Sequence, residues 1–399
     1  MKKRLLFYKI KKHINHKNAL VITGMRQVGK TTLMKALFDD ISSSAKLWFD
    51  FDNPLDQKIF ENEEYKNIYH ILAKQANLKN KKERLYIFID EIQNFPEITK
   101  IIKFLIDHYG IKFIVTGSSA FYLKNLFPES LSGRKFLYHL EPFSFNEFLY
   151  FKNKISLQEA KIKNIEDVIK EVHGFVDFKK REIDYNEYLK FGGFPEVVLT
   201  KDEETKKDIL KNIFSSFFKK DLMLLSDFND IREIRDLILL LVPRVGSMID
   251  VSRLAEELKT NRPRVYSYLE FLQGVFFIKL LSKFSKSIDR SVAGGRKVYF
   301  ADTGILNMIG DVNEAQLLEN AVVNQFSRYG DLSFYNKRNI SEIDIILDKK
   351  IGFEIKSTGT RKDQNKIEKI IQSIKIEKAF VVSKNFEKDL KNIIYPHFL

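Results

Sequence analysis

The sequence contains no cysteine among its 399 residues. This absence excludes disulfide bonds, thiolate zinc sites and cysteine nucleophiles, and it agrees with a reducing compartment. No apolar stretch approaches the length of a transmembrane helix, and the basic residues 1–4 are not followed by a signal-peptide core. We therefore expect a cytoplasmic protein with no membrane partner.

Histidine is also scarce, and its positions are scattered. No two histidines stand at ligand spacing on one expected element, so the sequence predicts neither a zinc site nor a Ser-His-Asp arrangement. The seven are His13, His16, His70, His108, His139, His173 and His397.

Basic residues exceed acidic ones. Lys and Arg number 67 against 53 Asp and Glu, a formal net charge of +14. This excess indicates a polyanionic partner, nucleic acid before membrane. A lysine-rich genome explains it equally well, because net charge alone says little about function. The length predicts two or three domains, and 44% hydrophobic residues supply their cores.

One stretch dominates what is present. Residues 19–23 form a short apolar run rich in β-branched side chains, and residues 24–31 match G-x-x-x-x-G-K-[ST] without a mismatch. The pattern predicts a buried strand, a phosphate-binding loop and a helix that begins near Lys30. Glycines at 24 and 29 let successive N–H groups point into one concavity, and the helix directs its positive end at the phosphates.

The loop motif implies a role for each of its residues. Lys30 is expected between the β- and γ-phosphates of ATP, and Thr31 is expected to ligate Mg²⁺. The full set predicted to bind the nucleotide from this loop is Gly24, Arg26, Gln27, Val28, Gly29, Lys30, Thr31 and Thr32.

Strands and helices alternate over residues 19–140. Further apolar runs at 46–52, 85–90, 112–116 and 134–140 are typical of strands, with helical segments between them. This alternation predicts a parallel α/β sheet with right-handed crossovers. Ligands of such sheets sit at the carboxyl ends of the strands, where the loop and the polar ends of the later strands fall.

Two carboxylates follow the run at 85–89. Asp90 is expected to hold Mg²⁺, and Glu91 to polarise the attacking water, which implies hydrolysis and not binding alone. Thr116, or Ser118 after it, is expected to reach the γ-phosphate from its own strand. The competing interpretation is a pair of surface acids and a polar turn.

Arg134 lies in Ser-Gly-Arg-Lys just before the last strand. An arginine at a domain edge can complete the site of a neighbouring subunit as an arginine finger, which would require a homo-oligomer. A phosphate sensor within the same chain and a plain surface charge are the alternatives.

Residues 146–227 are expected to form a helical lid or connector, and residues 228–300 have a winged-helix pattern. Helices at 249–258 and 262–272 precede strands at 275–281 and 296–300. In the functional interpretation, part of the second helix faces a DNA groove and its phosphates. A module for packing or protein contact is equally compatible. The residues that would face DNA are Arg262, Arg264, Tyr266 and Ser267.

Residues 301–399 carry a second constellation. Asp344 lies on one expected hairpin strand, residues 341–347. Glu354 and Lys356 share a face of the other strand because they are two residues apart, and Asp344 can join them from across the hairpin. Two carboxylates can hold Mg²⁺ while a lysine steers or deprotonates water for phosphodiester attack. Glu319, on an expected helix, is the third candidate ligand. An amphipathic hairpin with a charged solvent face is the alternative.

Taken together, these motifs resemble a prokaryotic family of AAA-type ATPases with a winged helix and a C-terminal domain similar to the PD-(D/E)xK, restriction-endonuclease-like fold. The resemblance implies a P-loop ATPase core over 1–145, a connector over 146–227, a winged helix over 228–300 and the nuclease-like domain over 301–399. Ile343 stands where that superfamily usually has proline. Other matching stretches are residues 89–93, 116–119, 131–134, 192–196, 301–304, 319–320, 341–344 and 354–356.

Two functions remain open from the sequence. The first is an Mg²⁺-dependent ATPase whose nucleotide state controls a C-terminal half that binds DNA and cleaves it. The second is an ATP-gated switch or scaffold whose C-terminal half binds protein or nucleic acid without nuclease activity.

Overall fold

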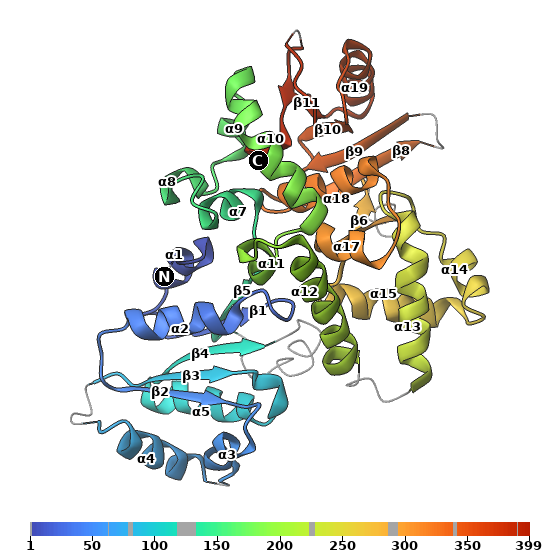
Figure 1. The fold of residues 1–399 in the computed structure, drawn as a ribbon. Helices are drawn as coiled ribbons and strands as arrows, with labels where there is room; N and C mark the ends of the chain where they lie inside the picture. Colours follow the sequence, from blue (N-terminus) through green and yellow to red (C-terminus); the bar gives the residue numbers. More distant parts are fainter. Residues whose placement is uncertain are drawn as a thin grey trace. The chain divides into compact units, whose positions relative to one another are not determined.

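The computed structural model describes residues 2–62, 64–78, 83–117, 133–222, 228–285, 294–337, 341–388 and 390–399. The chain divides into two compact units, one made of Met1–Glu141 with Gly274–Phe276 and the other of Pro142–Gln273 with Phe277–Leu399. Each unit combines helices with a β-sheet (Figure 1). We describe each unit by itself.

The first unit alternates strands and helices. Its elements are α1 (Leu5–Lys11), β1 (Ala19–Thr23), α2 (Lys30–Asp40), β2 (Lys46–Asp50), α3 (Pro54–Gln57), η1 (Lys58–Glu61), α4 (Tyr65–Gln75), β3 (Tyr86–Asp90), η2 (Ile92–Asn94), α5 (Ile98–Tyr109), β4 (Lys112–Gly117) and β5 (Lys135–His139).

The five strands form one sheet in the order β2-β3-β4-β1-β5, and every neighbouring pair is parallel. The predicted parallel α/β sheet is therefore confirmed. Strand β4 lies between β1 and β3, so the loop after β1 and the acids at the end of β3 come from strands that are not adjacent. Both nevertheless lie at the carboxyl edge of the sheet.

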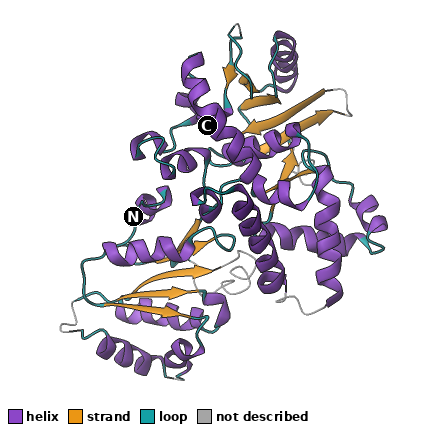
Figure 2. Cartoon of the chain, in the orientation of Figure 1, coloured by secondary structure: helices purple, strands orange, loops and turns teal. Residues whose placement is uncertain are grey.

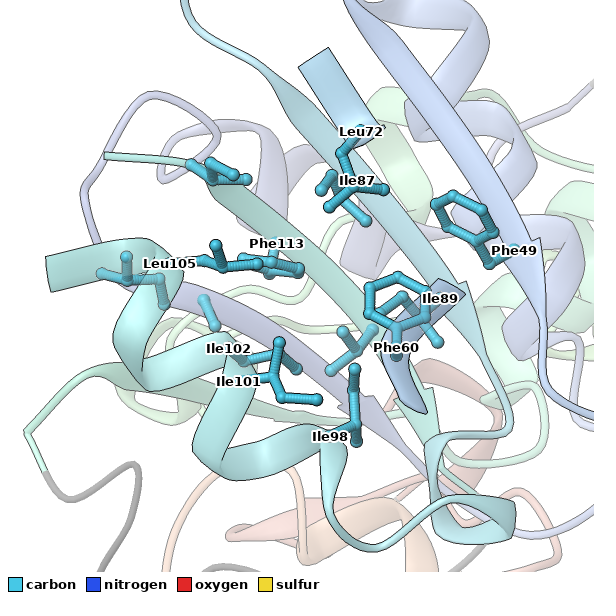
Figure 3. Packing of buried hydrophobic residues seen from close by; sticks show 14 of the residues in the cluster. Phe49, Phe60, Leu72, Ile87, Ile89, Ile98, Ile101, Ile102, Leu105 and Phe113 are labelled. Atoms are coloured by element: carbon cyan, nitrogen blue, oxygen red, sulfur yellow. The ribbon is translucent and has the colours of Figure 1, made fainter. Parts of the chain in front are cut away.

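One face of this sheet packs on an amphipathic helix. In α5 the apolar residues recur at 98, 101, 102, 105 and 106, the spacing of a single helix face, and all are buried. They meet alternate residues of the strands, such as Ile87, Ile89 and Phe113 (Figure 3). The other face carries Phe88, which packs edge-on against Phe38 of α2. The strands thus lie between helical layers, as Figure 2 shows.

The second unit begins with helices and ends with a mixed sheet. Its elements are α7 (Phe145–Phe151), α8 (Leu157–Ala160), α9 (Ile165–Val168), α10 (Phe175–Phe191), α11 (Pro195–Leu199), α12 (Glu203–Ser216), η3 (Phe217–Leu222), α13 (Phe228–Leu241), η4 (Val242–Arg244), α14 (Val251–Glu257), α15 (Arg262–Gly274), β6 (Ile278–Lys283), β7 (Arg296–Phe300), α17 (Thr303–Ile309), α18 (Glu314–Phe326), β8 (Leu332–Lys337), β9 (Ser341–Leu347), β10 (Ile351–Lys356), α19 (Arg361–Ile374), β11 (Lys378–Ser383), β12 (Ile393–Ile394) and η5 (Pro396–Phe398).

Seven strands form the sheet of this unit, in the order β12-β11-β10-β9-β8-β6-β7. Strands β6 and β7 pair antiparallel, as a wing would, but β6 also pairs in parallel with β8 through Ser282 and Lys283. The expected wing strands are therefore continuous with the sheet that carries the C-terminal constellation. The predicted boundary at 300/301 runs through this sheet, and the finer division of residues 146–399 stays a prediction.

A buried aspartate joins the helical part of this unit to its C-terminal part. Asp302 caps α17 by accepting from the N–H of Ile305 at 3.1 Å, and it also accepts from the N–H of Gly193 at 2.7 Å. Gly192, whose φ is 73°, leaves no room for a side chain, because a Cβ there would lie 2.1 Å from the Asp302 carboxylate. Full burial outweighs these hydrogen bonds and raises the pKa of Asp302 to about 6.

Within the described parts of the chain, no helix combines the length and the apolar character that crossing a lipid bilayer requires.

Candidate functional site

The turn between β1 and α2 folds into a tight concave loop. Gly24, Gln27 and Gly29 all have positive φ, of 152°, 61° and 93°, so the chain reverses within six residues. At Gly24 a Cβ would lie 2.1 Å from the carbonyl oxygen of Leu140, so only glycine fits beside the segment that follows β5. Alternating left- and right-handed residues in such a turn aim several N–H groups into one hollow, a shape that suits an anion.

The first turn of α2 places two functional side chains at this loop. Lys30 is buried, and its ammonium donates to the carbonyls of Gly24 and Met25 at 3.0 Å each. Thr31 donates from Oγ1 to Oδ2 of Asp90 at 2.7 Å, although Asp90 ends a strand two positions away in the sheet. Around them, Arg26 is half-buried, Val28 is buried and Thr32 is exposed. The loop lysine, the loop threonine and the β3 acid thus occupy one small region.

Thr116 links the two acids at the end of β3. Its hydroxyl donates to Oδ1 of Asp90 and accepts from the N–H of Glu91 at 3.0 Å. Thr116 is fully buried on β4, between the strands of the loop and the acids. The structure therefore places this hydroxyl on the acids, where the sequence predicted a phosphate contact; Ser118, the other candidate, lies outside the described residues.

The environment of the two acids differs. Asp90 is buried, and burial raises its pKa, an effect that the hydrogen bonds from Thr116 and Thr31 oppose. Glu91 is half-exposed, has a left-handed φ of 53°, and accepts from the side-chain amide of Gln93. A buried acid next to a threonine and a more open acid beside it are arranged for two different tasks.

Arg4 contacts the loop, and no pattern in the sequence had indicated this contact. The guanidinium is buried and donates to the carbonyl of Val28 in the loop at 2.8 Å and to the carbonyl of Glu141 at 2.8 Å. It therefore connects the start of α1, the loop and the segment after β5. No local pattern could have revealed these contacts, because they span 24 and 137 residues.

Arg134 lies at the opposite edge of the same sheet. Its carbonyl accepts from the N–H of Ala19 at 2.8 Å, and β5 then runs for five residues, about 17 Å, before reaching the loop edge. Its side chain pairs with Asp107 at 2.7 Å. This position does not agree with the alternative of a phosphate sensor for its own chain. The ion pair with Asp107 is compatible with the alternative of a plain surface charge, and the arginine finger stays a prediction.

The second unit holds the C-terminal constellation. Asp344 on β9 is half-buried and accepts from the N–H of Ile355 at 2.8 Å. Glu354 on β10 is buried, and its Oε1 accepts from Lys356 at 2.9 Å and from Lys366 of α19 at 3.0 Å. The other oxygen of Glu354 is buried and has no hydrogen-bond partner among the residues that the structure describes. Burial, together with the charges of Glu319 and Glu354, raises the pKa of Asp344.

Glu319, the third predicted ligand, has other partners. Its Oε1 accepts from the Tyr299 hydroxyl at 2.7 Å and lies 3.5 Å from the ammonium of Lys297. Across the residues that the structure describes, no three acidic or histidine side chains converge closely enough to hold one metal ion. The structure thus differs from the predicted three-carboxylate metal site, because a buried lysine draws Glu319 to itself.

The expected DNA-reading helix, α15, is partly committed to internal contacts. Arg264 pairs with Asp230 at 2.6 Å and with Glu233 at 3.2 Å, both on α13. The hydroxyl of Ser267 bonds back to the carbonyl of Pro263 at 3.1 Å. Arg262 and Tyr266 of the predicted set are exposed. Two carboxylates beside Arg264 would oppose a nearby phosphate.

Comparison with known proteins identifies the domain type of the first unit. A family model described as an AAA domain matches residues 16–149, which contain the loop, the acids and all five strands. A domain of unknown function, DUF8612, matches residues 182–316. The N-terminal unit is therefore an AAA domain, the class of P-loop nucleotide-binding ATPases.

The chain belongs to the same family as the uncharacterized protein MJ1544 of Methanocaldococcus jannaschii. The two are 30% identical over 378 residues, which cover 90% of this chain and 79% of that protein. An uncharacterized protein of Haemophilus influenzae is 28% identical over 84% of this chain and 82% of its own length. Among solved structures, Cdc6p from Pyrobaculum aerophilum is similar at a TM-score of 0.28 and 12% identity, over 79% of this chain and 92% of that one.

Proposed function

We propose that this protein binds and hydrolyses ATP with Mg²⁺ at the loop of its N-terminal unit. The observation that supports this most directly is the hydrogen bond of 2.7 Å between Thr31 and Asp90. A residue of helix α2 and the last residue of strand β3 meet there, beside a buried lysine and a loop that leaves no room for a Cβ at Gly24. A hydroxyl and a carboxylate at one point are oxygen ligands of the kind Mg²⁺ prefers.

In this proposal each residue has a distinct task. The loop N–H groups from Gly24 to Thr32 and the ammonium of Lys30 hold the phosphates, and the carbonyls that Lys30 now contacts keep it at the hollow. Thr31 and Asp90 would hold Mg²⁺, which when bound neutralises phosphate charge. Glu91 orients the attacking water and accepts its proton, while Thr116 fixes both acids.

We further propose that Arg134 acts on the site of a neighbouring subunit. It lies at the sheet edge remote from its own loop, and an arginine there can stabilise the charge that develops on a transferred phosphoryl group only in trans. The AAA domain would then work as a homo-oligomer.

For the C-terminal unit we propose binding of nucleic acid, with DNA as the first candidate. The formal net charge of +14 belongs to the whole chain and supports a polyanionic partner without assigning it to one unit. Asp344 and Glu354 fit a divalent cation, since one buried oxygen of Glu354 has no hydrogen-bond partner within the described part of the chain. Lys356, within 2.9 Å of Glu354, would position or deprotonate a water for phosphodiester cleavage.

The alternative is a unit that binds protein or nucleic acid without cutting. Glu319 pairs with Lys297 and accepts from Tyr299, and no three acids of the described residues converge to hold one metal ion, which favours this alternative. In that case nucleotide binding by the AAA domain would still control what the second unit binds.

The ATPase proposal is tested by two substitutions and a phosphate-release assay. Lys30→Ala should abolish nucleotide binding or turnover. Glu91→Gln should keep ATP binding and stop hydrolysis, because the amide cannot accept the proton of water. Full turnover in the Glu91→Gln variant would remove Glu91 from its assigned role, and full turnover in Lys30→Ala would contradict the site itself.

The two alternatives for the second unit are separated by a cleavage assay. Supercoiled plasmid is incubated with Mg²⁺ or Mn²⁺, with and without ATP, using wild type and Lys356→Ala. Nicking by wild type that the variant lacks supports the nuclease. No nicking under any condition supports the binding module, and DNA affinity that does not fall with added salt would argue against phosphate contacts.

A further inference from the structure

Lys297 is a buried lysine surrounded by three carboxylates. It lies on β7 with a side chain that is 3% exposed, and its ammonium is 2.6 Å from Glu342, 3.5 Å from Glu319 and 3.8 Å from Asp344. The ammonium also lies 5.4 Å above the ring of Phe334. Burial alone would lower the pKa of Lys297, but these carboxylates outweigh it and raise the pKa, so the lysine is charged.

Its partners are held firmly in turn. The Tyr299 hydroxyl donates to the same Glu319 oxygen at 2.7 Å. On the other side, the backbone of Gly246 packs against Glu319 so closely that a Cβ there would lie 2.7 Å from its carboxylate. Glu319 therefore lies between Lys297, the Tyr299 hydroxyl and the backbone of the segment before α14. The arrangement is built and not an accidental surface ion pair.

The acids of this region outnumber its cations. Glu319, Glu342 and Asp344 surround Lys297, while Glu354 is shared by Lys356 and Lys366. Among the described residues, four carboxylates thus lie near three ammonium groups, and one buried oxygen of Glu354 has no hydrogen-bond partner. Without Lys297, Glu319, Glu342 and Asp344 would lose the ammonium group that they share, which is costly in a buried setting.

We propose that Lys297 is an internal counter-ion that limits divalent-cation binding at Asp344 and Glu354. Its fixed positive charge lies about one ion-pair distance from Asp344, so an arriving cation meets both the attraction of the carboxylates and the repulsion of the ammonium. Glu319 and Glu342 pair with Lys297. Only Asp344 and Glu354 then remain to bind the metal ion. This inference rests on the proposed cation site of the second unit and sets its affinity.

The test measures Mn²⁺ binding to the full chain without nucleotide. The paramagnetic signal of free Mn²⁺ is the readout. Lys297→Met should bind Mn²⁺ on the order of tenfold more tightly than wild type, because a like charge near the ligands is removed. Without metal, the melting temperature of Lys297→Met should be lower than that of wild type. On addition of Mn²⁺, the melting temperature of the variant should rise markedly. An added Asp344→Asn substitution should abolish the gained binding, which assigns it to this cluster.

Lys206 provides the matched control. It is a lysine of the same unit with a side chain 4% exposed, and it is paired with Glu187. Lys206→Met should destabilise the protein similarly but leave Mn²⁺ affinity unchanged. Lys297→Arg keeps the charge and should bind Mn²⁺ as weakly as wild type.

Glu342→Gln covers the case in which Lys297→Met does not fold, since the Glu342 side chain is 39% exposed and tolerant of change. It removes the shortest contact of Lys297, leaves the ammonium to Asp344, and should weaken Mn²⁺ binding. Equal Mn²⁺ affinity in wild type and the Lys297 or Glu342 variants would overturn the role of Lys297 alone. No binding in any of them would overturn the cation site together with this inference.

Discussion

Arg4 contacts the predicted phosphate-binding loop although it lies 24 residues before Val28 in the sequence. Its guanidinium holds the carbonyl of Val28 in the loop and that of Glu141 beyond β5. A loop that is already shaped binds phosphate at a lower entropic cost than one that must be ordered. We expect such preorganisation to contribute to ATP affinity without any contact to ATP.

Arg4→Ala should weaken ATP binding on the order of tenfold, since hydrogen bonds from a charged group contribute about 1.5–3 kcal/mol. The measurement is a titration with a fluorescent ATP analogue. Arg84→Ala is the control, because Arg84 also donates to two carbonyls of this unit, those of Asn15 and His16, away from the loop. Equal loss in both variants would mean that Arg4 only stabilises the fold.

Thr116→Val should slow hydrolysis more than it weakens binding. Valine keeps the shape but loses the bonds to Asp90 and to the N–H of Glu91, and an unpaired buried N–H costs about 1–3 kcal/mol. We expect kcat to fall about tenfold or more with ATP affinity within a few fold. Thr99→Val, a buried threonine of the same unit whose hydroxyl bonds to Pro96, should leave kcat unchanged.

Loss of ATP binding equal to the loss of kcat in Thr116→Val would instead place this hydroxyl on the nucleotide. That result would restore the phosphate contact expected from the sequence. The two assignments differ in which kinetic parameter moves, so a single variant separates them.

At the scale of elements, the sequence predicted the AAA sheet well and the second sheet less well. Runs such as 85–89 are apolar because parallel strands are covered on both faces, and the loop motif fixes where the first strand ends. The sequence predicts a strand near β6 but does not show which strand pairs with it. Pairing with β8 depends on residues 333 and 334, some 50 positions later.

The same limit applies to the candidate sites. The residues of the loop, Asp90 and Glu91 were found because their spacing is set by local backbone geometry. Arg4, Lys297 and Lys366 were missed because each acts on a residue from a distant element, and no spacing rule applies to such a pair. Glu319 was placed correctly on a helix, but its partner Lys297 decides where its carboxylate goes.

Asp302 joins the turn before α11 to the start of α17. Its raised pKa predicts that the free energy of unfolding depends on pH. Its pKa is raised from an ordinary value of 3.8 to about 6, so the folded state takes up this proton at higher pH than the unfolded state. Its contribution to stability is thus fully present below about pH 4 and is lost as pH rises through about 6. Relative to Asp302→Asn, wild type should gain up to about 3 kcal/mol of unfolding free energy between pH 7 and pH 4.

Urea denaturation of both proteins across this pH range measures the difference. The variant itself should be less stable at every pH, because its amide nitrogen would face the N–H of Gly193 or Ile305, which are both donors. A constant difference between the two proteins would show that Asp302 does not titrate in this range.

At the scale of the whole molecule, the position of Arg134 predicts a shared active site. Arg134→Ala and Glu91→Gln should each be nearly inactive, but a mixture should recover part of the ATPase activity, because some interfaces would combine an intact Arg134 with an intact Glu91. Turnover per subunit of wild type should also rise with protein concentration. Full activity of Arg134→Ala, or no recovery on mixing, would count against the shared site.

The sheet of the second unit also bears on how the protein can be divided. A fragment that starts at residue 301 would lack β6 and β7, so β8 would become an open edge with unpaired N–H and C=O groups along a strand that contains the buried Phe334. Open edges of this kind pair with other chains. Such a fragment should therefore aggregate, and Asp344, Glu354 and Lys356 are best studied together with the helices and strands that precede them.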